Sequence, residues 1–314
     1  MSAPVAIVGA GSIGVSWAIV FARAGRSVRM QDPDAARREA VPGEIAARLA
    51  QLDEAGLLDE APDAIAARVT VAADLAATVA RAGHVQECAP ERLELKRELF
   101  ARLDGLAAPD AVLASSSSAI VASRFAEGLP GRARCLVVHP GNPPHLIPVV
   151  EVVPAPFTDP AVVERTVALL EAAGQSPVVV RREIEGFVFN RLQGALLREA
   201  YCLVRDGVAS VDEVDRVVRD GLGRRWAFVG PFETADLNTR GGIASHAEKL
   251  GPAYARMGAE RGQNDPWTPD LVEKVTAERR ALLPLEDWDE RVAWRDRALI
   301  ALLRARRELS GREN

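Results

Sequence analysis

The sequence predicts an α/β protein, with a doubly wound parallel sheet in its N-terminal part and an all-helical C-terminal part. Two observations predict this organisation. Short apolar runs alternate with helical patterns up to about residue 181, which is the order that right-handed strand-helix-strand units produce. Beyond residue 186 the apolar residues recur only at helical spacing. We therefore predict two domains, residues 1–184 and 185–314, in this chain of 314 residues.

The composition excludes several classes of protein. With 48% hydrophobic residues, 26% charged residues and a net charge of -5, the chain has neither an apolar run that would span a membrane nor the concentrated basic surface that binds nucleic acid. No basic leader precedes the first apolar run, so we expect a cytoplasmic protein that acts on a small molecule. The three cysteines, Cys88, Cys135 and Cys202, are widely spaced in apolar surroundings, which indicates buried thiols and no metal site.

A glycine-rich turn near the N-terminus predicts a dinucleotide site. The apolar run Val5–Val8 leads into Gly9-Ala-Gly11-Ser-Ile-Gly14, and a helical pattern follows from Trp17 to Arg23. In this context the glycines allow the tight turn, the close approach of backbone to pyrophosphate, and the packing of helix on strand. The unpaired N–H groups at the helix start face the phosphates. We predict a Rossmann-type domain in which the cofactor contacts Gly9, Gly11, Ser12, Ile13 and Gly14.

The next strand indicates which dinucleotide binds. It begins at Ser27 and ends at Asp32, 18 residues after Gly14. An acid at this place can hydrogen-bond both ribose hydroxyls and repels a 2′-phosphate, so we predict NAD as the cofactor. Arg37 and Arg38 are the one feature that favours NADP.

The alternation continues to the end of the first domain. The predicted elements are, in order, a helix at 34–58, a strand at 69–71, a helix at 75–82, a strand at 84–88, a helix at 91–103, a strand at 111–114, a helix at 160–170 and a strand at 177–181. Ligands of such sheets lie at the carboxyl ends of the strands, where Glu91, Ser118 and His139 fall. The serine run Ser115–Ser118 is by itself typical of a solvated turn, but here it lies next to the expected cofactor crevice.

One further segment predicts catalytic chemistry. An apolar run from Cys135 ends in His139, a proline-rich turn follows, and Glu151 stands twelve residues after the histidine within the run Val149–Val153. A lone carboxylate among β-branched residues of a strand is costly unless it is paired, and His139 is the nearest partner. We predict that His139 is a general base and that Glu151 orients it. Taken alone, the segment also fits a core histidine and a glutamate at a strand edge.

The C-terminal part adds two candidate residues. Asn190 lies in the first turn of a helix predicted to run from Gly186 to Gly207, and its neutral amide suits contact with a hydroxyl or carbonyl oxygen, although capping or a surface role is the usual one. Ser210–Glu213 forms a capping box for the next helix. Arg225 lies in a glycine-bounded loop. Arginine is the natural bidentate clamp for a carboxylate, although paired arginines commonly only solvate a loop.

Together these motifs resemble the 3-hydroxyacyl-CoA dehydrogenase superfamily, and within it the L-gulonate 3-dehydrogenase and lambda-crystallin branch. The resemblance spans nearly the whole chain. The motifs that carry it, in the family's order, are Gly9–Gly14, Glu91–Lys96, the serine run, His139–Pro144, Val149–Val153, Gly186–Leu192 and Gly230–Glu233. The resemblance implies that Ser118, His139, Glu151 and Asn190 form the catalytic set, and that Asp32, Glu91, Lys96 and Asn142 contact NAD. It also implies a homodimer formed through the helical domain.

The branch is indicated by departures from the acyl-CoA pattern. Members that act on acyl-CoA generally have Asn-Thr where this chain has Ser116 and Ser117, and a residue other than arginine at the position of Arg225. The resemblance therefore implies NAD-dependent oxidation of the 3-hydroxyl of a small free acid such as L-gulonate, with Arg225 binding the carboxylate. The chain differs from the branch at Gly141, usually a larger residue, and at His145, usually a tyrosine.

Two alternative functions stay open. A 3-hydroxyacyl-CoA dehydrogenase would use the same four residues on a thioester. The other alternative is a non-catalytic, NAD-binding structural protein, as the lens role of the crystallin relatives suggests. Such a protein has no physical need for a paired, buried acid.

Overall fold

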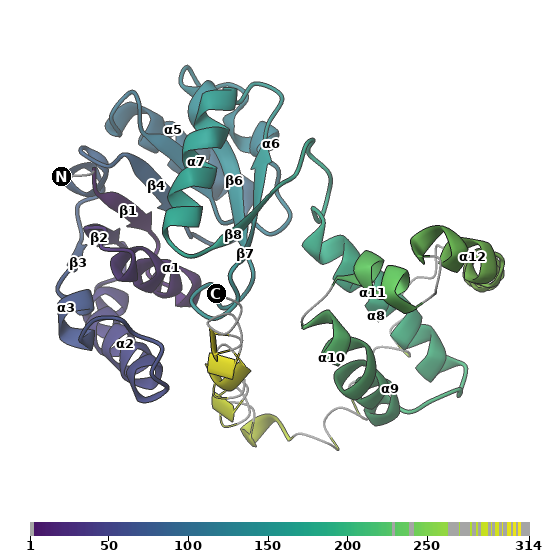
Figure 1. Cartoon of the computed structure of the whole chain (residues 1–314). Coiled ribbons are helices and arrows are strands. Elements are labelled where there is room, and N and C mark those ends of the chain that lie inside the picture. Colours follow the sequence, from purple (N-terminus) through teal and green to yellow (C-terminus); the bar gives the residue numbers. More distant parts are fainter. Residues whose placement is uncertain are drawn as a thin grey trace. The chain divides into compact units, whose positions relative to one another are not determined.

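The chain forms two compact units (Figure 1). The computed structural model describes residues 3–227, 230–238 and 242–262, together with 270, 277, 281, 284–287, 290, 293–294, 297, 300–302, 304–305 and 307–308. Unit 1 comprises Met1–Arg191 and Ala293–Asn314, and unit 2 comprises Leu192–Val292. Unit 1 holds a sheet with helices on both faces, and the described part of unit 2 is helical, so the predicted fold class is confirmed.

Unit 1 is built on an eight-stranded sheet with the order β3-β2-β1-β4-β5-β6-β7-β8. The strands are β1 (Val5–Val8), β2 (Val28–Gln31), β3 (Val69–Ala72), β4 (His84–Glu87), β5 (Val112–Ser115), β6 (Cys135–Pro140), β7 (Val149–Pro154) and β8 (Ser176–Val179). The order reverses between β1 and β4, which is where such sheets bind their ligands.

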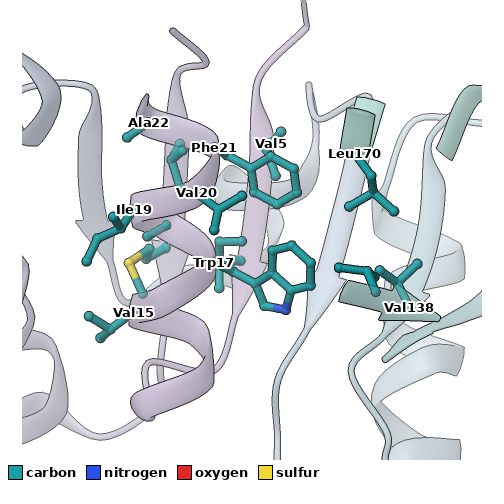
Figure 2. Packing of buried hydrophobic residues seen from close by; sticks show 14 of the residues in the cluster. Val5, Val15, Trp17, Ile19, Val20, Phe21, Ala22, Val138 and Leu170 are labelled. Carbon is teal, nitrogen blue, oxygen red and sulfur yellow. The ribbon is translucent and has the colours of Figure 1, made fainter. Parts of the chain in front are cut away.

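The strands are apolar because both faces of the sheet are covered. On β1, Val5 and Ile7 point into one buried cluster, and Ala6 and Val8 point into the other. The first cluster is closed by α1 (Ser12–Arg23), α2 (Ala35–Glu54), α3 (Pro62–Ala66) and α7 (Pro160–Ala172), and the second by α4 (Leu75–Val79), α5 (Leu93–Leu106) and α6 (Ala122–Ala126). Figure 2 shows Trp17 and Phe21 pointing from α1 toward Val138 and Leu170 within the first cluster.

One pairing departs from the predicted parallel sheet, because β6 and β7 run antiparallel. Residues 141–148, which join them, are too few for the crossover that a parallel pairing needs. The register places His139 directly opposite Glu151. The connection contains a cis peptide bond between Asn142 and Pro143.

Unit 2 is described as a series of helices. They are α8 (Phe189–Arg205), which begins in unit 1, then α9 (Val211–Val217), a π-helical turn (Val218–Leu222), α10 (Gly223–Trp226), α11 (Pro231–Asn238), α12 (Gly242–Arg261) and a 3-10 turn (Leu285–Asp287). The capping box predicted at Ser210 and Glu213 is confirmed. Arg261 at the end of α12 bonds Glu199 within α8 and Asp206 directly after α8. Among the described helices, none combines the length and the apolar character needed to cross a bilayer.

Candidate active site

The glycine-rich turn joins β1 to α1 at the switch point of the sheet. Gly9 has a φ of 105°, and a Cβ there would lie 2.7 Å from the carbonyl oxygen of Cys88. A Cβ on Gly14 would overlap the carbonyl oxygen of Gly9. Gly11 is exposed before the first turn of α1, which contains Ser12 and Ile13. Two of the three glycines are thus required by contacts that exclude any side chain.

A pocket of about 960 Å³ lies at this turn and suits a dinucleotide. Gly9, Gly11 and Asp32 line it. The Asp32 carboxylate is fixed at its wall, because Oδ2 accepts the N–H of Ala10 at 2.7 Å and Oδ1 accepts the N–H of Asp34 at 2.9 Å. These residues fit the adenosine end of NAD, and contact of Asp32 with the ribose stays a prediction.

The two arginines that favoured NADP are engaged within the protein. Arg37 donates to the carbonyl of Ala10 at 2.6 Å and to Glu44 at 2.8 Å. Arg38 donates to the carbonyls of Asp32 and Pro33 at 2.8 and 2.9 Å. A guanidinium already bonded in this way is a poor clamp for a 2′-phosphate, which agrees with NAD as the cofactor.

His139 and Glu151 meet across β6 and β7. His139 Nδ1 lies 2.8 Å from Glu151 Oε2, and the two residues are only 6% and 3% exposed. The other ring nitrogen, Nε2, has no hydrogen-bond partner among the described residues. The pairing predicted between these residues is present. A ring held at Nδ1 and open at Nε2 can accept a proton there.

The second oxygen of Glu151 reaches the start of α8. Oε1 accepts the backbone N–H groups of Val188 at 2.6 Å and Phe189 at 3.0 Å. Burial by itself would raise the pKa of Glu151, but the bonds from His139 and from these two N–H groups outweigh it, so the pKa of Glu151 lies below its usual value. The carboxylate therefore stays ionised beside the imidazole.

Ser118 and Asn190 are also brought together. The Asn190 amide donates through Nδ2 to the carbonyl oxygen of Ser118 at 2.8 Å. Glu91 Oε1 accepts the N–H groups of Ser118, Ala119 and Ile120 at 3.1 to 3.2 Å. The backbone of Ser118 is thus held at both ends, while its exposed hydroxyl has no hydrogen-bond partner among the described residues.

Lys96 is buried beside Glu87. Its ammonium group is 1% exposed and bonds both oxygens of Glu87, at 3.0 and 2.9 Å, while Glu91 Oε2 lies 3.9 Å away. Glu87 is fully buried at the carboxyl end of β4. Contact of Glu91 or Lys96 with NAD stays a prediction.

The remaining predicted positions are divided between the two units. Asn142 is exposed on the loop after β6. In the same loop, a Cβ on Gly141 would lie 2.5 Å from Ile147 Cγ2, and His145 Nδ1 lies 3.1 Å from Ser16 Oγ. Burial, followed by the charges of Arg48 and Arg23, lowers the pKa of His145 to about 3.

Arg225 is exposed on α10 of unit 2, directly after the π-helical turn, and its contact with a substrate stays a prediction.

Sequence reasoning missed Glu87 and the N–H donors of Val188 and Phe189. Glu87 had a signal, because it lies at the end of a predicted strand and Lys96 follows nine residues later in a predicted helix. Backbone donors have no signal in side-chain chemistry, so the contacts at the start of α8 could not be read from residue types.

A dinucleotide pocket and a histidine with one open nitrogen, both at the carboxyl edge of a doubly wound sheet, are the arrangement of a nicotinamide-dependent dehydrogenase. The family model for the 3-hydroxyacyl-CoA dehydrogenase NAD binding domain matches residues 4–184, and the model for the C-terminal domain of the same enzymes matches residues 186–282. The chain belongs to the 3-hydroxyacyl-CoA dehydrogenase family. It is an NAD-dependent oxidoreductase of that family.

Individual relatives cover almost the whole chain. A lambda-crystallin homolog of Bos taurus is 41% identical over 314 residues, which is 98% of each chain. An L-carnitine dehydrogenase of Streptomyces griseus subsp. griseus is 39% identical over 96% of this chain and 89% of its own. Among solved structures, 5-formyl-3-hydroxy-2-methylpyridine 4-carboxylic acid 5-dehydrogenase, an NAD+-dependent dismutase, superposes with a TM-score of 0.84 at 28% identity and covers 97% of this chain and 98% of its own.

Proposed function

We propose that the protein oxidises the 3-hydroxyl of a small free hydroxy acid, L-gulonate or a similar acid, to the 3-keto acid with NAD. The observation that carries the proposal is the 2.8 Å bond between His139 Nδ1 and Glu151 Oε2, in a pair that leaves Nε2 open. An acid that only stabilised a core histidine would not require the second nitrogen to stay unbonded.

His139 performs the proton transfer. A secondary alcohol carbon gives up hydride only as its hydroxyl proton leaves, so a base within hydrogen-bond reach of that oxygen is worth typically about 10²- to 10⁴-fold. Nε2 accepts the proton, and Glu151 stabilises the imidazolium from the Nδ1 side. NAD, when bound, supplies the hydride acceptor.

Ser118 and Asn190 orient the reacting oxygen. The Ser118 hydroxyl is exposed on a loop whose backbone Glu91 holds. The Asn190 amide carries two N–H groups and uses one of them on the Ser118 carbonyl, so the second can donate to the oxygen that becomes a carbonyl.

A free acid is the favoured substrate because Arg225 can bind a carboxylate bidentately. Arg225 follows a π-helical turn, a feature frequent at functional sites. Two of the relatives are named for acids: L-carnitine, and a pyridine 4-carboxylic acid. The alternative substrate is a 3-hydroxyacyl-CoA thioester, which membership of the family favours.

A substrate panel separates the two. NADH formation is measured with L-gulonate, 3-hydroxybutyrate and L-carnitine, and NADH consumption with acetoacetyl-CoA. We expect turnover of at least one free acid, with kcat/KM well above that for the thioester. Turnover of the thioester alone would overturn the proposal.

Arg225→Met tests the carboxylate clamp. We expect the KM for the free acid to rise about 100-fold, because a bidentate charged bond is lost, while NAD affinity is kept. Arg224→Met is the matched control, since Arg224 is the adjacent arginine and pairs with Asp220 at 3.6 Å. Equal KM values in the two variants would rule out the clamp.

The homodimer through the helical domain is part of the proposal. Leu192 on α8 is 60% exposed, and Leu250, Tyr254 and Met257 on α12 are 39 to 56% exposed at helical spacing. Exposed apolar stripes of this kind commonly mark interfaces. Light scattering of the full chain should give twice its mass, and Leu192→Glu should give the monomer.

A further inference from the structure

The turn before α8 has an unusual backbone. Phe187 has a φ of 50°, and among the described residues it is the only non-glycine residue with a positive φ. The left-handed region is disfavoured for a bulky L-residue and persists only where the surroundings impose it. Gly186, directly before it, has a φ of 74°, so two successive left-handed residues turn the chain into the helix.

The turn aims backbone donors at the proposed catalytic acid. Directly after Phe187, the N–H groups of Val188 and Phe189 both bond Glu151 Oε1, at 2.6 and 3.0 Å. Phe187 itself donates its N–H to the carbonyl of Ile184 at 3.1 Å, which closes the turn. Glu151 is therefore held from two sides, by α8 through Oε1 and by His139 through Oε2.

The side chain of Phe187 contributes to the same geometry. It is 0% exposed within the second buried cluster of unit 1, which fixes the residue despite its backbone. Its ring centroid lies 5.5 Å from that of His139, so the imidazole rests against a ring that cannot move away. The ring of Phe189 lies nearly perpendicular to the imidazole, with 6.2 Å between the ring centroids.

We propose that the left-handed Gly186–Phe187 turn is a positioning element for the general base. It directs the N–H groups of residues 188 and 189 onto Glu151, which fixes the Nδ1–H of His139 and leaves Nε2 as the proton acceptor. Phe187 acts through Glu151 and His139 and does not itself touch the substrate. The inference rests on the proposed function of His139. It adds to that function, because the orientation of His139 then depends on the first turn of α8, the helix that continues into unit 2.

The comparison of Phe189→Pro with Phe189→Ala isolates one of the two donors. Both variants remove the half-buried ring, but only proline removes the N–H, and proline is well tolerated at the first position of a helix. Losing a donor makes the acid-histidine pair easier to protonate. Two or three such donors lower a carboxylate pKa by about two units, so we expect the acid limb of the kcat/KM profile to lie about half to one pH unit higher in the proline variant.

Phe187→Leu tests the turn itself, with Phe100→Leu as the matched control. Phe100 is also 0% exposed and belongs to the same buried cluster, but it packs on Phe125 rather than on His139. Both variants should lower the melting temperature by similar amounts. Only Phe187→Leu should lower kcat, by about tenfold, and move the acid limb, because only its loss frees the acid.

The outcomes separate the inference from the proposed function. If Phe189→Pro and Phe189→Ala share one pH profile, the positioning inference is overturned, whether or not Phe187→Leu folds. If His139→Gln is as active as wild type, the proposed base is wrong and the inference falls with it. A shifted acid limb in Phe189→Pro and Phe187→Leu, with NAD affinity unchanged, supports the inference.

Discussion

Within the described part of unit 1, the buried pairs Glu87–Lys96 and Glu151–His139 differ in the hydrogen-bonding atoms that they leave unbonded. In the first, Glu87 and Lys96 are 0% and 1% exposed, and the carboxylate also accepts the Ala89 N–H at 2.7 Å and the Ser115 hydroxyl at 2.5 Å. In the second, Glu151 is equally well bonded, but His139 keeps Nε2 open. The first pair has no group that can accept a proton from a ligand, whereas the second keeps one nitrogen that can.

The two carboxylates are held in the same manner, so the difference lies in the bases. Each glutamate bonds its base and at least one backbone N–H. Lysine contributes three donors and no acceptor, so the ammonium of Lys96 cannot accept a proton. Histidine has two distinct nitrogens, and the bond at Nδ1 defines the role of Nε2.

The largest effect on activity is expected when the His139–Glu151 pair loses its histidine. His139→Gln should lower kcat/KM by about 10³- to 10⁴-fold, because the proton acceptor is removed. NAD affinity, measured by fluorescence titration, should stay near that of wild type. A loss smaller than tenfold would mean that another group takes the proton.

Substitutions in the Glu87–Lys96 pair should change the stability of the protein rather than its activity. Lys96→Met leaves Glu87 buried without its counter-ion and should lower the free energy of unfolding by about 3–5 kcal/mol in urea titrations. The double variant Glu87→Gln with Lys96→Met should recover more than half of that loss, since no buried charge is left. If Lys96→Met instead keeps its stability and loses NAD affinity, then Lys96 is a cofactor ligand rather than an internal counter-ion.

Glu151→Gln tests whether the acid sets the tautomer. The N–H groups of Val188 and Phe189 would hold the amide oxygen, so the amide nitrogen would donate to His139 Nδ1 and the proton would move to Nε2. We expect kcat/KM to fall on the order of 10²- to 10³-fold, because the base is blocked. Glu151→Ala, which imposes no tautomer, should be the more active of the two, and the reverse order would contradict the argument.

Much of unit 1 could be predicted because its signals are local. The glycine turn and Asp32 follow from turn chemistry and spacing, and the strands follow from apolar runs bounded by helical patterns. The facing of His139 and Glu151 could be inferred because a short turn joins two apolar runs, although the antiparallel direction of β7 was missed.

The groups that hold Glu151 and His139 in place could not be predicted, because they depend on tertiary contacts. The positive φ of Phe187 is imposed by packing, and the donors to Glu151 are backbone groups that every sequence carries. Lys96 shows a different limit. Its ammonium bonds Glu87, and contact with NAD stays a prediction, because a residue type alone cannot distinguish a ligand from a counter-ion.

The smallest effect is expected at a histidine whose partner is an amide instead of an acid. His84 Nε2 bonds Gln86 Oε1 at 3.0 Å, its Nδ1 has no partner, and burial lowers its pKa from 6.5 to about 4. The unfolded chain therefore takes up a proton at this residue at a higher pH than the folded chain does, so stability is lost as the pH falls from 6.5 to about 4. Between these limits the free energy of unfolding should fall by roughly 2–3 kcal/mol more in wild type than in His84→Leu.

The variant also loses the hydrogen bond to Gln86, but this loss lowers its stability by the same amount at every pH. The difference between the two proteins in how stability changes with pH therefore reports the titration of His84. Parallel urea-unfolding curves for the two proteins would mean that His84 is charged in the fold, and that burial without a carboxylate does not keep a histidine neutral here.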